Sequence, residues 1–141
     1  MIRQRIYLPK IDWSIDCFYA VTRLNVDEVM RSLERAGCRE KNLRTAYENL
    51  TRGDLNTGLC FTGDGRSVLV TSLTSSGGEL ANSLVHELHH LATQIGNTLG
   101  YDLMGEEVCY IAGDIAKEMY NVAGKYLCEG CRSKGRYYRL P

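Results

Sequence analysis

The segment from residue 79 to residue 99 constrains the fold of this chain more than any other part of the sequence. It contains no proline, and its apolar residues recur at helical spacing, so we predict one long helix that ends at Gly100. On a helical wheel with about 100° per residue, the large aliphatic side chains gather on one side. These side chains are Leu84, Leu88, Leu91, Ile95 and Leu99. The segment is therefore predicted to be an amphipathic helix.

All three histidines of the chain lie on this segment. His86 and His90 fall opposite the apolar side and one turn apart, where side chains are about 5–6 Å apart at Cβ, so two imidazoles can share one ion. Glu87 lies about 100° round from His86, beside such an ion rather than beneath it. Residues 86–90, HELHH, therefore match the motif H-E-x-x-H on a helix.

The chemistry of a catalytic zinc ion requires this spacing. Such an ion takes three protein ligands and keeps one open position, and it lowers the pKa of bound water from about 15.7 to about 7. We predict one Zn²⁺ with His86 and His90 as ligands and Glu87 as the general base that takes the proton of that water. The motif also arises by chance, and an isolated histidine pair at this spacing is commonly solvated. His89 lies about 60° from His86, where it either donates a hydrogen bond to a group beside the metal ligands or is a solvated side chain.

The third ligand has to be a carboxylate, a cysteine or a group from a partner, because the chain has no further histidine. Glu107, at the start of the last predicted helix, is the preferred candidate. Glu106 is the alternative, and Cys109 is a weaker candidate than either. Tyr110 and Asp114 share the helical face of Glu107, and Asp114 could orient a ligand histidine. Acidic residues also favour the first turn of a helix because of its dipole, which is the competing explanation for this pair.

The other segments predict a mixed set of elements within one domain of residues 1–141. Because strands and helices are grouped rather than strictly alternating, the predicted class is α+β. The expected elements are a strand at 2–8, an apolar segment at 11–22 that fits a strand or a helix, helices from 25 or 26 to Gly37 and at 40–51, a hairpin at 58–73 that turns at 63–65, a break at 75–78, a last helix from about 105 to 126, and an irregular tail at about 127–141.

Composition narrows the choice of partners and location. The 17 Lys and Arg residues balance the 17 Asp and Glu residues, so we expect no nucleic acid and no anionic membrane as a partner. No signal peptide and no run of about 20 apolar residues is present, so a cytoplasmic location with reduced cysteines is expected. Cys128 and Cys131 form a C-x-x-C without the second pair that a zinc ribbon needs, so a structural or incidental role is expected.

The segments SLVHELHHLATQIG and GEEVCYIAGDIAKEMY resemble the gluzincin-type zinc metallopeptidases, and in particular small phage and mobile-element members, over about residues 80–120. The resemblance implies a zincin-like α+β fold with a small twisted sheet on helices. It implies His86, His90 and Glu107 as ligands and Glu87 as the base. It also implies that residues 67–73 form an edge strand that binds an extended peptide by strand addition. Tyr110 and His89 are candidates for an oxyanion donor.

The sequence therefore favours a zinc-dependent metallopeptidase that acts on a peptide or protein substrate. One alternative is a zincin-fold regulator or binding module that keeps the metal without strong catalysis. Another is a phage-type protein-interaction component with a degenerate site. The presence of Glu87 favours the enzyme, because ligands alone would suffice for a structural zinc ion.

Overall fold

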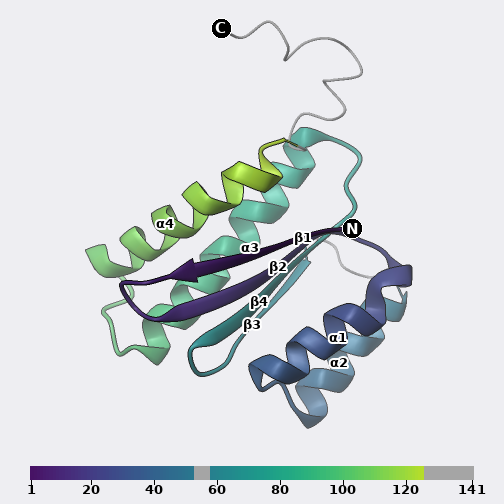
Figure 1. The fold of residues 1–141 in the computed structure, drawn as a ribbon, viewed down its shortest axis with the longest axis horizontal. Helices are drawn as coiled ribbons and strands as arrows, with labels where there is room; N and C mark the ends of the chain where they lie inside the picture. Colours follow the sequence, from purple (N-terminus) through teal and green to yellow (C-terminus); the bar gives the residue numbers. More distant parts are fainter. Residues whose placement is uncertain (53–57, 126–141) are drawn as a thin grey trace, which may run out of the picture.

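The computed structural model describes residues 1–52 and 58–125. Within these ranges the chain is α+β, as predicted, and its strands and α-helices follow the order ββααββαα (Figure 1). A short 3₁₀ turn, Arg23–Asn25, precedes the first helix. The elements are β1 (Ile2–Leu8), β2 (Trp13–Val21), α1 (Val26–Ala36), α2 (Glu40–Arg52), β3 (Gly58–Thr62), β4 (Arg66–Ser72), α3 (Gly77–Thr98) and α4 (Glu106–Ala123).

The strands form one mixed sheet in the order β1-β2-β4-β3. The β1–β2 and β3–β4 pairs are antiparallel, whereas β2 and β4 are parallel, and α1, α2 and β3 lie between these two strands in the sequence. The predicted hairpin at 58–73 is confirmed. The expectation that residues 67–73 form an edge strand is wrong, because β4 pairs with β2 on one side and with β3 on the other. The edges of the sheet are β1 and β3.

Helices cover both faces of the sheet (Figure 1). On one face, Phe18, Val68 and Val70 pack with apolar residues of α1 and α2. On the other face, Ile15 and Leu69 pack with those of α3 and α4. Because β2 is covered on both faces, its sequence is apolar at almost every position, which is why residues 11–22 could not be assigned from periodicity.

The predicted helix boundaries largely follow the local capping signals. Gly37 ends α1 with φ +101°, and Gly100 follows α3 with φ +74°. The start of α3 differs from the prediction, because residues 77–78 form its first turn rather than a break. The hydroxyl of Ser76 accepts a hydrogen bond from the backbone N–H of Glu79 at 3.1 Å, so Ser76 is the N-cap.

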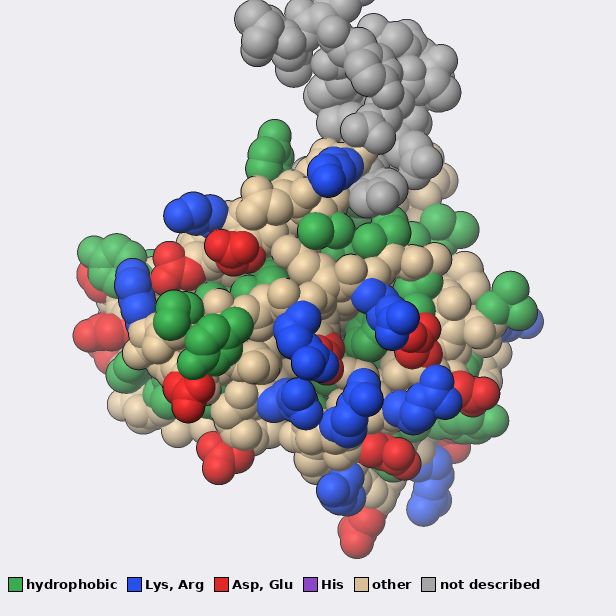
Figure 2. All heavy atoms as spheres, viewed as in Figure 1, with side chains coloured by type: hydrophobic (Ala, Val, Ile, Leu, Met, Phe, Trp, Pro, Cys, Tyr) green, Lys and Arg blue, Asp and Glu red, His purple; other side chains and the backbone are tan. Residues whose placement is uncertain are grey.

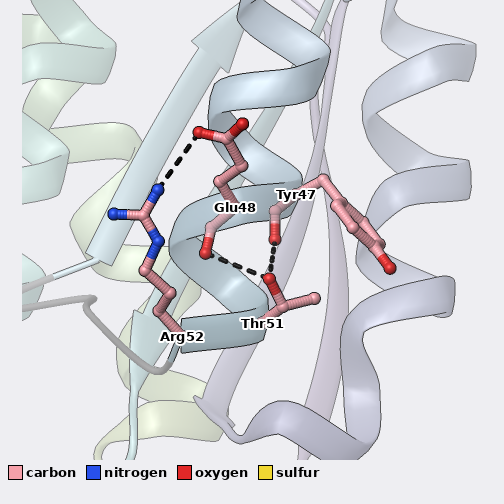
Figure 3. Close-up of polar contacts among 4 residues, drawn as sticks. All are labelled: Tyr47, Glu48, Thr51 and Arg52. Carbon is pink, nitrogen blue, oxygen red and sulfur yellow. Dashed lines mark hydrogen bonds and ion pairs between the residues drawn. The ribbon is translucent and has the colours of Figure 1, made fainter.

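The last turn of α2 is held by local contacts (Figure 3). The Thr51 hydroxyl donates to the carbonyl oxygens of Tyr47 and Glu48 at 2.8 and 3.1 Å, and Arg52 pairs with the Glu48 carboxylate at 3.2 Å. An exposed ion pair of this kind contributes only about 0.3–0.5 kcal/mol. The helix therefore depends mainly on its packing against α1, where Leu50 joins the same buried apolar cluster.

Two sequence-based expectations concern the C-terminal part of the chain. The last helix ends at Ala123 rather than near residue 126. The expected irregular tail, with Cys128 and Cys131, lies outside the described residues. Among the helices that the structure describes, none is sufficiently long and apolar to span a bilayer.

Candidate metal site on helix α3

The two motif histidines form a pair on the exposed side of α3. The ring centroids of His86 and His90 lie 4.9 Å apart, with the ring planes at 73° to each other. Both side chains are exposed, whereas Leu91 and Ile95 of the same helix are fully buried. The predicted separation of an apolar side and a histidine side is confirmed.

The spacing of the two rings suits a shared divalent cation. With Zn–N bonds of about 2.0–2.1 Å and tetrahedral geometry, two imidazoles on one zinc ion place their centroids about 5 Å apart. The observed 4.9 Å matches this value. Because both rings face solvent, the remaining coordination positions would be accessible to water or to a substrate.

Glu87 points away from solvent, toward the edge strand β3. Its exposure is only 3%, and its Cγ lies 3.1 Å from the position that a Cβ on Gly58 would occupy. The same Cβ would come within 1.9 Å of the carbonyl oxygen of Val70. Glycine at position 58 therefore provides the space in which β3 pairs with β4 and in which Glu87 packs against the strand.

A thiol and an amide lie beside Glu87. The Cys60 thiol donates to Oε1 of Gln94 at 3.6 Å. Burial, and then the nearby negative charge of Glu87, raise the pKa of the Cys60 thiol to about 12. Cys60, Gly58 and Gln94 were not among the site residues predicted from the sequence. Gln94 lies seven residues after Glu87 and thus on the same side of the helix, but nothing local identifies β3 as the strand that this side faces.

His89 lies on the exposed side of α3 and makes no hydrogen bond or ion pair with any part of the chain that the structure describes. Its neighbour in the sequence, Leu88, packs against the core. That His89 donates a hydrogen bond beside the metal ligands, or to an oxyanion, stays a prediction.

The acidic face of α4 borders a cavity that lies away from the histidine pair. Glu107, Tyr110 and Asp114 share one face, as predicted, and this face borders a cavity of about 210 Å³ together with Leu8 and other residues of the β1–β2 turn. Lys10 from that turn pairs with Asp114 at 3.7 Å. The cavity lies against β1, which is the opposite edge of the sheet from Glu87 and β3.

The packing of α3 against α4 explains why the acidic face of α4 is separated from the histidine pair. The two helices run antiparallel (Figure 1), and Gly96 of α3 meets Val108 in the first turn of α4. His90 precedes Gly96 by six residues, about 9 Å along the helix axis, so the start of α4 lies beyond the histidine pair. Within residues 1–52 and 58–125, no three His, Cys, Asp or Glu side chains form a group that could hold a metal ion. The structure thus brings His86 and His90 together but does not bring Glu106, Glu107 or Cys109 to them, and a third ligand among these stays a prediction.

Neither the family models nor the curated proteins nor the solved structures contain a significant match to the sequence or fold of this chain. The resemblance to gluzincin-type metallopeptidases therefore rests on the HELHH motif and the acidic pair, and a function has to be argued from the residues themselves.

The arrangement on α3 combines two kinds of group. Two solvent-facing imidazoles are suited to a divalent cation, and the carboxylate of the intervening residue Glu87 lies on the adjacent, buried side of the same turn. A cation ligand pair and a proton acceptor thus lie on the same turn of the helix, next to an edge strand.

Proposed function

We propose that the protein is a zinc-dependent hydrolase that cleaves peptide bonds, built on a minimal zincin-like domain. His86 and His90 hold the metal ion, and Glu87 is the general base. The observation that carries this proposal is the pairing of the two imidazole rings at 4.9 Å on the exposed side of α3, with the carboxylate of the HELHH motif between them in the sequence.

The sheet provides a further argument for a peptide substrate. Helix α3 packs against β3 and β4, and β3 is an edge strand whose only described partner is β4. An edge strand presents unpaired backbone N–H and C=O groups, to which an extended peptide can add as another strand. A peptide bound in this way would lie beside the helix that carries Glu87. Because β3 and not β4 lies at this edge of the sheet, the proposed peptide-binding strand is residues 58–62 instead of 67–73.

The proposed chemistry divides the work between the metal and Glu87. When bound, zinc polarises a carbonyl group and lowers the pKa of a water molecule. A carboxylate oxygen of Glu87 takes the proton of the attacking water and later delivers it to the nitrogen of the leaving amine, so the carboxylate is regenerated in each cycle. Gly58 keeps the backbone of β3 close to Glu87 without displacing that side chain.

A glutamate-to-glutamine substitution at position 87 separates the role of the base from that of the metal ligands. In the variant Glu87→Gln we expect one zinc ion per chain to be retained and the hydrolysis of an unfolded protein substrate to fall by about 10²–10⁴-fold, since the base is lost but both imidazoles remain. Zinc is measured by elemental analysis and hydrolysis by release of labelled fragments. Glu79→Gln, on the exposed start of the same helix, is the matched control and should keep full activity. Full activity of Glu87→Gln would refute its role as base.

A second candidate is a metal-binding module without hydrolytic activity. It is favoured by one observation, namely that the described residues provide two imidazoles but no three-residue ligand group. Zinc titrations of Glu107→Ala and Glu106→Ala discriminate between the two candidates. A loss of zinc affinity of more than about tenfold in one of them identifies the third ligand that a catalytic site needs. Unchanged affinity in both, together with a zinc-loaded parent that cleaves no unfolded protein, supports the binding module.

A further inference from the structure

An open trough lies on the sheet face opposite the histidine helix. Along the edge strand β1, Arg3 and Arg5 are exposed and point to the face that α1 and α2 cover elsewhere. Helix α1 packs against β4 and β3, whereas the helix that packs against β1 is α4, on the other face. The result is a cavity of about 300 Å³ between β1, β2 and α1, whose lining includes Arg3, Arg5, Asp16, Phe18 and Arg35.

The N-terminal part of the described chain, which contains the trough, carries a positive net charge although the whole chain is neutral. Residues 1–52 and 58–76 carry eleven Lys and Arg against eight Asp and Glu, whereas residues 77–125 carry two against seven. Figure 2 shows Lys and Arg side chains gathered over the region of β1, β2 and α1. A zero net charge therefore hides a basic face and an acidic helical layer, and the basic face attracts anions.

A buried carboxylate fixes one of the guanidinium groups. Asp16 of β2 lies directly opposite Arg5 in the β1–β2 ladder, and its side chain is only 8% exposed. Its Oδ1 accepts a hydrogen bond from Nε of Arg5 at 2.8 Å, and its Oδ2 accepts one from the hydroxyl of Ser32 in α1 at 2.9 Å. Both oxygens of Asp16 are thus engaged, and the carboxylate ties β1, β2 and α1 together at the floor of the trough.

Two of the three guanidinium groups, those of Arg5 and Arg35, keep donors that are not used within the described part of the chain. Arg5 makes no other hydrogen bond there, so the four N–H groups of its terminal nitrogens are left for an acceptor. Arg35 makes no ion pair with any described residue, and Arg3 pairs with Glu28 at the upper rim. Three guanidinium groups from two elements therefore surround a cavity, and one of them is held in a fixed orientation.

We propose that this trough binds a phosphate group, contacted by Arg3, Arg5 and Arg35, with Asp16 as the residue that positions Arg5. Planar guanidinium groups bind phosphate through paired N–H···O bonds, which suits them to this ligand better than to a single point charge. The cavity could receive the phosphate of a free metabolite or of a nucleic-acid backbone, and both present the same chemistry to the three arginines. The inference does not depend on the proposed hydrolase, since the trough and the histidine pair lie on opposite faces of the sheet.

Calorimetric titration of the full chain with pyrophosphate at low ionic strength tests the proposal. We expect saturable binding, weakened about tenfold in Arg35→Gln because one charge-assisted contact is lost. Arg44→Gln removes the same charge from the exposed side of α2 outside the trough, and should bind within about twofold of the parent. Thermal unfolding of both variants checks that the fold is retained, and zinc binding by both should stay unchanged.

The other outcomes are equally decisive. A short single-stranded oligonucleotide that binds more than tenfold more tightly than pyrophosphate, with the same sensitivity to Arg35→Gln, identifies nucleic acid as the source of the phosphate. Comparable affinities identify a free phosphate compound. Equal losses in Arg35→Gln and Arg44→Gln, binding of a triglutamate peptide as tight as that of pyrophosphate, or no binding of pyrophosphate would each overturn the proposal.

Discussion

Gly96 of α3 lies so close to Val108 of α4 that a Cβ on Gly96 would come within 2.6 Å of Cγ2 of Val108. This contact sets the spacing of the two helices, and it fixes where the first turn of α4 stands along α3. Gly96, six residues after His90, thus helps to set the position of the acidic pair relative to the histidines.

The variant Gly96→Ala is expected to lower the free energy of unfolding by about 1–3 kcal/mol, because the added methyl group overpacks the helix–helix contact. Urea denaturation measures the change. The matched control is Gly113→Ala in α4, where a Cβ would meet nothing within 4 Å. There the substitution should stabilise the protein by about 0.5–1 kcal/mol, since alanine is the better helix former. Equal effects of the two variants would show that the helices are not in close contact at Gly96.

Removing either paired imidazole should weaken zinc binding strongly. We expect His86→Ala and His90→Ala to lose at least about a hundredfold in zinc affinity, and His89→Ala to stay within about threefold, because its ring is not part of the pair. Competition with a chromogenic chelator measures all three. His89 is the matched control, as it is an exposed histidine on the same helix. Zinc affinity that falls most in His89→Ala would contradict the assignment of the ligands.

Asp16 should make stability depend on pH in the acid range. Burial alone would raise its pKa, but hydrogen bonds from Arg5 and Ser32 outweigh burial, and the charges of Arg5 and Arg66 add to them, so the pKa is held below its ordinary value. A carboxylate with a lowered pKa in the folded state contributes stability that is complete above its unfolded pKa of about 3.9 and is lost as the pH falls through its folded pKa.

We therefore expect Asp16→Asn to be less stable than the parent by about 1–3 kcal/mol at pH 7, and the difference to shrink as the pH falls below about 4. Urea denaturation at a series of pH values provides the comparison. Asp12→Asn is the control, because Asp12 is exposed and has φ +51°, a conformation that asparagine also adopts. If the difference in free energy of unfolding between Asp16→Asn and the parent stays constant down to pH 2, the charge of Asp16 is not its cause.

The thiols should differ sharply in reactivity. With a pKa of about 12, only about one Cys60 thiol in ten thousand is deprotonated at pH 8, and the thiolate is the reactive form. We expect Cys60 and the buried Cys17 to resist iodoacetamide in the folded protein, while the exposed Cys109 is alkylated readily. Mass spectrometry of peptides resolves the sites. Rapid alkylation of Cys60 under native conditions would mean that the thiol is not enclosed between β3 and α3.

Thr71 offers a stabilising substitution. Its hydroxyl is buried in β4 and has no hydrogen-bond partner among the residues that the structure describes. Thr71→Val keeps the shape of the side chain and removes the unpaired polar group, so we expect a gain of up to about 1 kcal/mol in the free energy of unfolding. Thr71→Ser is the comparison, since it keeps the hydroxyl and removes a methyl group, and it should destabilise the protein. A loss of stability in Thr71→Val would show that the hydroxyl is hydrogen-bonded.

The elements that the sequence predicted best depend on local chemistry. Gly37 ends a helix because it adopts a left-handed conformation, and the glycines at 63 and 65 mark a hairpin turn. The pairing of His86 with His90 follows from helical spacing alone. Each of these features is settled within a few residues, so no knowledge of the tertiary structure was needed.

The parts that were missed depend on contacts between distant segments. No local pattern indicates that β4 lies inside the sheet and β3 at its edge, because this order follows from the pairing of β4 with β2. The burial of Glu87 against β3 follows from the same order. The separation of Glu107 from the histidines depends on where α4 packs along α3, and the helical period gives only the direction in which Glu107 points.

The parallel pairing of β2 with β4 also bears on how the chain is made. During synthesis the β1–β2 hairpin, α1 and α2 leave the ribosome before β4, the strand that contributes to the core on both faces of the sheet. A nascent chain that stops short of β4 therefore carries apolar surface on both sides of β2 with little to cover it, and such intermediates are prone to aggregate. Helix α3 emerges later still, so the two imidazoles can meet only when most of the polypeptide is already available to fold.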